Sequence, residues 1–298
     1  MRIAVVRALS AASLSMCLAT GCALLSAGDY ASRAFMRESD PALAEDAFPT
    51  MIKAAEAIQL ANPGDRDDAT LVASLYVMYA NAFLEGKAFL LPDEAFEERL
   101  ALAGRANALY LRAAALLAPF IEAAAPGALG SAVGPDDPVL SRLGRKDVPT
   151  LYWTAAAILA AFASDPMDFE NAARVSGAMA LFERARSIEP DWNGGALHEL
   201  AITLYGSLPA DLGGDRSKAR EAFELAKSAT GASSPGAFVA YASSVCVPEG
   251  DADGFEQALE TALGLPDRPE SALMDAIARR KARRLLDDEE LYFYLGDI

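Results

Sequence analysis

A repeated spacing of small and aromatic residues places the strongest limit on how this chain can fold. A small residue, an aromatic residue and a second small residue recur at offsets of 0, 4 and 7, which is the spacing of one face of an α-helix. Small residues let neighbouring helices approach closely, and the aromatic ring fills the groove between them. The intact copies are Ala106, Tyr110, Ala113; Ala178, Phe182, Ala185; and Ala219, Phe223, Ala226.

Two degenerate copies extend the pattern, at Asp251, Phe255, Ala258 and at Met51, Ala55, Ile58. In one intact copy a proline, Pro190, follows at offset 12, as in the second helix of a tetratricopeptide repeat. A single copy could arise by chance in an alanine-rich helix, but five copies on alternate helical segments favour real, divergent repeats. We therefore expect cryptic tetratricopeptide-like helical hairpins stacked into a superhelical array.

Composition and helix-boundary signals predict an all-α protein of about eleven helices. The chain has 64 alanines among its 298 residues, and alanine is the strongest helix former. A stretch from 124 to 148 is rich in Gly and Pro and is expected to be a long loop, either functional or mobile. Pro, Gly and Asp signals place helices near 48–61, 65–86, 93–123, 149–164, 169–188, 194–207, 216–230, 235–247, 252–263, 269–286 and just before 294.

The first 22 residues read as a secretory signal. Arg2 and Arg7 precede an apolar run that is too short to cross roughly 30 Å of hydrocarbon, and small residues then lead to Cys22. The Gly-Cys ending resembles a bacterial lipobox, so we predict a lipoprotein signal peptide over 1–21 and lipidation of Cys22. The alternative is an ordinary cleaved signal with an incidental cysteine. Residues 22–41 would form a lipid-anchored tether and 42–298 a single helical domain.

Charge and cysteine content narrow the possible partners. The formal net charge of −16 makes nucleic acid and anionic lipid headgroups unfavourable ligands for the folded body, so membrane attachment is expected through the lipid anchor alone. After Cys17 leaves with the signal and Cys22 is lipidated, Cys246 is the remaining cysteine. No intrachain disulfide can then form in the mature protein.

The sequence holds little that points to catalysis. His198 is its single histidine, and with Cys246 it supplies too few ligands for a structural zinc site. No phosphate-binding loop or Gly-x-Ser-x-Gly elbow is present. We expect no enzyme activity, no metal and no cofactor; a hydrolase using His198 is the least favoured class.

Two segments on consecutive inner helices suggest an aromatic-lined ligand groove instead. Tyr152 and Trp153 open the helix after the long loop, and His198, Glu199 and Tyr205 lie on a later helix. The competing interpretation assigns these side chains to the core, where such residues are commonly found.

The same segments resemble the TatT family. The motifs are Asp-Val-Pro-x-Leu-Tyr-Trp at 147–153, Ala-x-x-Leu-Phe-Glu-Arg-Ala at 178–185, Gly-Gly-Ala-Leu-His at 194–198 and Gly-Ser-Leu-Pro-x3-Gly-Gly-Asp at 206–215. TatT proteins are periplasmic lipoproteins associated with tripartite ATP-independent periplasmic (TRAP) transporters. The resemblance implies a compact superhelix enclosing a channel, assembled into homotrimers.

The resemblance also implies a role. The resemblance predicts an accessory component of TRAP-type solute uptake. This component would bind the TRAP substrate-binding protein or a small organic ligand, or both, and the ligands would include hydrophobic molecules. Ala23 after the anchor cysteine is typical of lipoproteins sorted to the outer membrane, with the body in the periplasm. The alternative function is a general tetratricopeptide scaffold of the cell envelope, whose concave groove would take an extended peptide.

Overall fold

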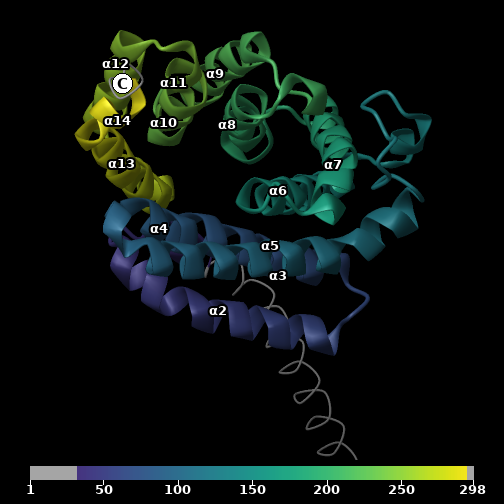
Figure 1. The fold of residues 1–298 in the computed structure, drawn as a ribbon. Coiled ribbons are helices and arrows are strands. Elements are labelled where there is room, and N and C mark those ends of the chain that lie inside the picture. Colours follow the sequence, from purple (N-terminus) through teal and green to yellow (C-terminus); the bar gives the residue numbers. More distant parts are fainter. Residues whose placement is uncertain (1–31, 294–298) are drawn as a thin grey trace, which may run out of the picture.

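The structure, a computed structural model, describes residues 32–293, and helices dominate that whole range (Figure 1). No β-strand occurs between 32 and 293, so the all-α prediction is confirmed. Residues 32–36 are helical as well. The α-helices that follow are α2 (Pro41–Ala61), α3 (Arg66–Tyr79), α4 (Gly86–Leu90), α5 (Phe96–Ala124), α6 (Val148–Ser164), α7 (Phe169–Ile188), α8 (Trp192–Ser207), α9 (Arg216–Thr230), α10 (Pro235–Tyr241), α11 (Val247–Glu249), α12 (Ala252–Gly264), α13 (Ala272–Asp287) and α14 (Glu289–Phe293).

Aspartates fix several of the helix starts. The Asp65 side chain accepts from the backbone N–H groups of residues 67 and 68, which have no partner inside α3. Asp215 caps α9, and Asp168 caps α7, in the same way. Such caps contribute about 1 kcal/mol each. The helix starts expected from Asp65 and Asp215 are therefore confirmed.

Two helices expected to be regular contain π-helical turns. The segment predicted as one helix near 65–86 is divided into α3, a π-helical segment η1 (Ala80–Glu85) and α4. The segment predicted near 235–247 is likewise divided by η6 (Ala242–Cys246). Such wide turns are typical of functional sites, and apolar periodicity over a few residues does not reveal them.

Helix α2 begins earlier than the sequence suggested. It starts at Pro41, after the N-cap Asp40, and continues through Pro49. A proline inside a helix removes one backbone hydrogen bond. Here Ala44, Phe48 and Ile52 are buried on the same face of α2, and their packing offsets that loss.

The small–aromatic–small residues lie in the core. Every member of the three intact copies is at most 7% exposed, and Tyr110 and Phe182 are fully buried. In the degenerate copy on α2, Ala55 is buried, but Ile58 is 46% exposed. The spacing therefore identifies residues at helix–helix contacts, while the tetratricopeptide character of the helix pairs stays a prediction.

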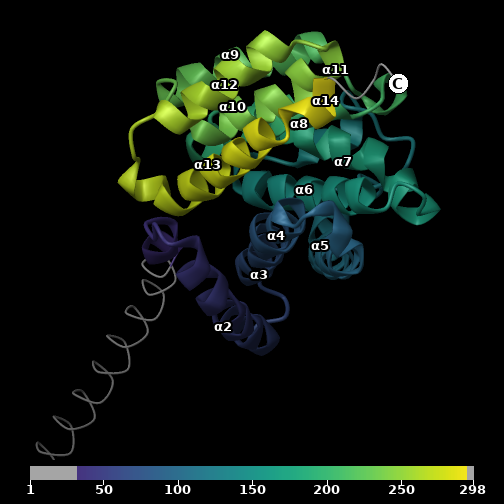
Figure 2. The ribbon, with the colours of Figure 1, turned by 60° about the vertical axis from the view of Figure 1, so that its left-hand side comes forward.

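The helices follow a curved path that returns to its beginning. Figure 1 shows α6, α8 and α10 toward the inside of the curve and α7, α9 and α12 toward the outside. Successive helices pack on one another, and α13 then contacts both α2 and α4. Figure 2, turned by 60°, also shows α13 close to the N-terminal helices. The two ends of the described chain are thus brought together.

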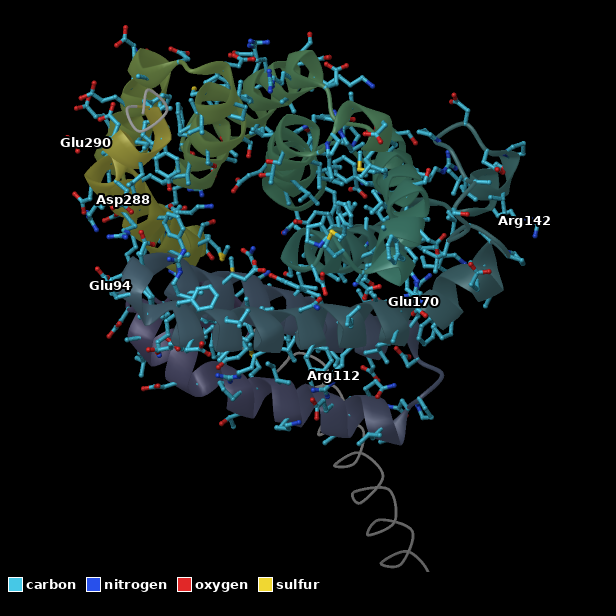
Figure 3. All side chains as sticks on the ribbon, viewed as in Figure 1. Glu94, Arg112, Arg142, Glu170, Asp288 and Glu290 are labelled. Carbon is cyan, nitrogen blue, oxygen red and sulfur yellow. The ribbon has the colours of Figure 1, made fainter. Side chains whose placement is uncertain are left out.

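A polar contact fastens the early helices to one another. Figure 3 shows Arg112 of α5 between α5 and α2. Its guanidinium donates to the Tyr76 hydroxyl over 2.6 Å and to the Glu56 carboxylate over 3.3 Å. Tyr76 in turn donates to Glu56 over 2.7 Å, so α2, α3 and α5 share one network.

The long Gly- and Pro-rich loop, which the sequence suggested is functional or mobile, packs on α7. Leu140 and Leu143 are buried, and Arg184 of α7 donates to the Leu143 carbonyl over 2.7 and 3.1 Å. A Cβ on Gly177 of α7 would lie 3.0 Å from the Leu129 carbonyl carbon, so that glycine allows the close approach. These contacts hold the loop in place before α6 begins.

The predicted signal peptide over 1–21 and the lipidation site Cys22 lie outside the described residues, as does the first half of the 22–41 tether. Within 32–293, no helix combines the length and the apolar character that crossing a membrane requires. Cys246 is buried and is a free thiol.

Candidate functional site

The start of α6 positions two of the predicted groove residues. The Asp147 carboxylate accepts from the Gly144 backbone N–H over 2.8 Å and from Arg66 of α3 over 2.6 Å. Pro149 sits in the first turn, where a missing N–H costs nothing. With its start held in this way, α6 places Tyr152 and Trp153 about one turn in.

Tyr152 and Trp153 belong to an aromatic cluster completed by Trp192. The Tyr152 ring packs edge-on against Trp153, with 4.9 Å between ring centres. It also packs against Trp192 at the start of α8 in a tilted arrangement, with 4.8 Å between ring centres. All three side chains are half-buried. Such ring pairs add about 0.5–1.5 kcal/mol beyond their burial, so this cluster joins α6 to α8 firmly while leaving part of each ring accessible.

The charge of Glu199 on α8 acts on the hydroxyl of Tyr152 in this cluster. Burial raises the pKa of the Tyr152 hydroxyl, and the negative charge of Glu199 raises it further. Burial also raises the pKa of the Glu199 carboxyl, an effect that Asp275 increases and that Ser234 and Arg268 oppose. The charge of Glu199 thus acts on Tyr152, whose ring in turn packs against Trp153.

A polar network that the sequence analysis missed holds Glu199. Ser234 donates to the Glu199 carboxylate over 3.0 Å. Arg268 forms a bidentate ion pair with Asp275, in which Nε and Nη2 lie 3.0 Å and 2.5 Å from the two carboxylate oxygens. The same Nη2 lies 3.4 Å from the Ser234 hydroxyl oxygen. Asp275 is only 1% exposed. One signal was available: Asp275 lies seven residues before Ala282, on the buried face of α13.

His198 has a partner within the protein. It is 3% exposed, and its Nε2 lies 3.0 Å from the carboxylate of Asp191 in the turn before α8. The first turn of α8 itself is irregular: Asn193, Gly194 and Gly195 have positive φ angles, which the two glycines adopt without strain. The side chain of His198 is thus directed to the start of its own helix, while Glu199 is directed to Ser234.

Tyr205 is also held inside the protein, at the contact between α7 and α8. Its hydroxyl donates to Glu183 and accepts from Arg186 over 2.6 Å, and it is 3% exposed. Burial and the bond to Glu183 raise the pKa of this hydroxyl. The structure therefore packs Tyr152 on Trp153 and bonds Glu199 to Ser234, His198 to Asp191, and Tyr205 to Glu183 and Arg186. Across 32–293, no three His, Cys, Asp or Glu side chains are placed to hold a metal ion.

Comparison with known proteins identifies the family to which the chain belongs. Residues 37–293, nearly the whole described chain, match the family described as the TRAP transporter T-component. The chain belongs to this family. It is also 35% identical over 267 residues to an uncharacterized protein of Treponema pallidum (strain Nichols), an alignment that covers 88% of this chain and 82% of that relative.

Membership of the T-component family confirms the resemblance seen in the sequence. TRAP systems are tripartite ATP-independent periplasmic transporters, and the T component is an accessory, periplasmic part of them rather than a member of a known enzyme family. The motifs at 147–153 and 194–198 lie at the starts of α6 and α8, where the aromatic cluster forms.

Proposed function

We propose that this protein is a periplasmic, lipid-anchored accessory component of a TRAP-type uptake system. It binds the TRAP substrate-binding protein or a small organic ligand, or both, and the ligands include hydrophobic molecules. It acts by binding and not by turnover. The observation that carries this proposal is the T-component match over residues 37–293. The homotrimer implied by the resemblance is part of the proposal.

The inner aromatic cluster supports a binding role. Ligand sites are mostly apolar and hold a few well-placed polar groups that orient the ligand. Tyr152, Trp153 and Trp192 supply partly accessible rings, and Glu199 supplies a polar group fixed by Ser234. In this proposal Tyr152, Trp153 and Glu199 contact the ligand, while His198 and Tyr205 contribute by holding α8 in position.

Partner binding is tested by capture of the substrate-binding protein. The full chain, tagged at its C-terminus, should retain a TRAP substrate-binding protein of the same organism and should not retain an unrelated periplasmic binding protein. Light scattering should give the mass of a trimer. Failure to capture the substrate-binding protein, at concentrations that bring both proteins to tens of micromolar, would reject the transport role.

The lipid anchor is tested by labelling. The wild-type protein should incorporate labelled palmitate and sediment with outer membranes, and Cys22→Ser should do neither, because acyl chains provide the membrane affinity. Unchanged labelling of Cys22→Ser would show that Cys22 is not the anchor.

The second candidate is a general tetratricopeptide scaffold. The burial of the repeated small and aromatic residues at helix contacts favours it. A scaffold would bind an extended peptide, so a peptide-array screen that finds tight, sequence-specific binding, together with no capture of the substrate-binding protein, would favour this function.

A further inference from the structure

A cavity of about 390 Å³ lies where the two ends of the helical array meet. Its walls come from α2, from the π-helical segment η1 with α4, and from α13. The apolar part of the wall is formed by Phe83, Phe89, Leu90 and Ile277. We call it the seam cavity. Its volume is within the range of small-molecule sites, which is about 300–1,000 Å³.

The charge of the seam cavity differs from that of the protein. Three cationic side chains line it, Lys87, Arg280 and Lys281, against two carboxylates, Glu45 and Glu85. The chain as a whole has a formal net charge of −16. A cavity with an excess of positive charge inside such an acidic protein offers an anion a local attraction that the surface does not.

The two kinds of charge in the cavity are not equally available. The Glu85 carboxylate already accepts from the Tyr110 hydroxyl over 2.8 Å and from the Ser164 hydroxyl over 3.0 Å. Among the described residues, no carboxylate lies within 4.0 Å of the cationic groups of Lys87, Arg280 or Lys281. An entering cation would therefore have to compete for Glu85 and would find only Glu45 open to it, whereas an entering anion would find three unpaired cations.

Lys281 is the cation placed to receive that anion. Its ammonium nitrogen lies 5.7 Å from the centre of the Phe89 ring, so the charge sits beside the apolar wall. The Lys281 side chain is exposed to solvent, while the protein packed around its amine lowers the pKa of the ammonium group, an effect that Glu85 opposes. A partly desolvated ammonium gains most from pairing with an anion.

We propose that the seam cavity binds a small organic carboxylate, with its carboxylate group on Lys281 and its apolar part against Phe89 and Ile277. This inference rests on the proposed function, of which it specifies the ligand chemistry and the place. The site joins α13 to α4, so a bound carboxylate contacts both ends of the helical array at once.

Three probes with the same six-carbon chain test the chemistry. Hexanoate, hexan-1-ol and hexylamine differ only in their head group, and each is titrated calorimetrically into the full chain carrying Cys22→Ser, which removes acyl chains that would themselves bind an apolar probe. Hexanoate should bind, hexan-1-ol should bind at least about tenfold more weakly, and hexylamine should not bind. Equal affinity for all three, or binding of hexylamine alone, would overturn the proposal, as would absence of hexanoate binding at millimolar concentration.

Substitutions test whether hexanoate binds in the seam cavity. Lys281→Met keeps the length of the side chain and removes its charge, so hexanoate affinity should fall at least about tenfold, while Lys281→Arg should remain within a few-fold of the wild type. The matched control is Lys227→Met on α9. Lys227 pairs with Glu224 and does not line the seam cavity, and its position is far in the sequence from the residues that do. Unchanged affinity in Lys281→Met would overturn the assignment. If Lys281→Met fails to fold, Ile277→Asp, which places a negative charge in the cavity, must abolish hexanoate binding.

The same preparations separate this inference from the proposed function. Capture of the substrate-binding protein is measured on the wild type and on Lys281→Met. Capture without hexanoate binding rejects the seam site alone, and hexanoate binding without capture rejects the partner role alone.

Discussion

The hydroxyl of Ser234 donates a hydrogen bond of 3.0 Å to the carboxylate of Glu199, and this bond ties the middle of α8 to the residue that precedes α10. The packing there is close: a Cβ on the neighbouring Gly236 would lie 3.0 Å from the Glu199 carboxyl carbon. Because burial raises the pKa of Glu199, ionising this group works against the folded state.

Glu199→Gln should therefore change how stability depends on pH. As the pH rises through 4.5, the usual pKa, the unfolded chain loses the proton of residue 199 before the folded chain does. The free energy of unfolding of the wild type should then fall relative to that of Glu199→Gln, until the pH passes the raised pKa of the folded state, and level off above it. Urea denaturation of both proteins across this pH window measures the difference.

The control for this experiment is Glu221→Gln, which removes the same charge at an exposed position on α9, away from Ser234. A stability difference for Glu199→Gln that grows in favour of the wild type with rising pH would contradict the expectation.

His198→Ala should destabilise the protein. The substitution removes the 3.0 Å contact with Asp191 and leaves a small cavity at a position that is 3% exposed, so we expect a loss of about 1–3 kcal/mol in the free energy of unfolding. Capture of the substrate-binding protein by the remaining folded protein should be unchanged. A melting temperature equal to that of the wild type together with weakened capture would instead favour the ligand role considered from the sequence.

Gly206→Ala should destabilise the contact between α8 and η6. The new Cβ would lie 2.8 Å from the Ser244 Cβ, which is closer than side-chain atoms pack, and overpacking of this kind costs about 1–3 kcal/mol. Gly104→Ala is the matched control, because no atom lies within 4 Å of its new Cβ on the exposed face of α5. That substitution should stabilise α5 by about 0.5–1 kcal/mol. Thermal denaturation that shows the same effect for both alanines would contradict this account of close packing.

Phe182→Ala tests the repeated spacing itself. Phe182 is fully buried on α7 between Ala178 and Ala185, so its truncation should cost about 3–5 kcal/mol. Phe169→Ala removes the same ring from the first position of the same helix, where the side chain is 83% exposed, and should change stability by less than about 0.5 kcal/mol. Chemical denaturation of the two variants gives the comparison. Similar losses at both positions would mean that the spacing does not identify the core.

Local patterns in the sequence determined much of the fold. Alanine content and helical spacing determined that the chain is helical, and Asp65 and Asp215 determined where two helices begin, because a capping side chain acts on amides only two or three residues away. The small–aromatic–small spacing identified buried residues such as Phe182 for a similar reason, since one face of a helix is a property of a short segment.

Patterns that depend on wider context were not visible. The π-helical turns η1 and η6 shift the register of a helix by single residues, and packing against neighbouring helices, not the local sequence, decides where such a turn forms. Helix α2 begins at Pro41 although its start was expected near 48, and it continues through Pro49 because the burial of Phe48 and Ile52 offsets the lost hydrogen bond. Neither effect has a signature within a few residues.

Only the tertiary structure decided which polar groups meet. Glu199 lies beside Ser234 and near the Arg268–Asp275 pair, and Lys281 of α13 lies over Phe89 of α4 although 192 residues separate them in the sequence. The sequence singled out Glu199, His198 and Tyr205 but could not supply their partners, which are Ser234 for Glu199, Asp191 for His198, and Glu183 and Arg186 for Tyr205. The physical reason is that curvature in a stacked helical array accumulates from a small rotation at every helix contact. The sum of those rotations decides where the two ends of the array meet and which side chains face each other there. No single segment of the sequence determines that sum.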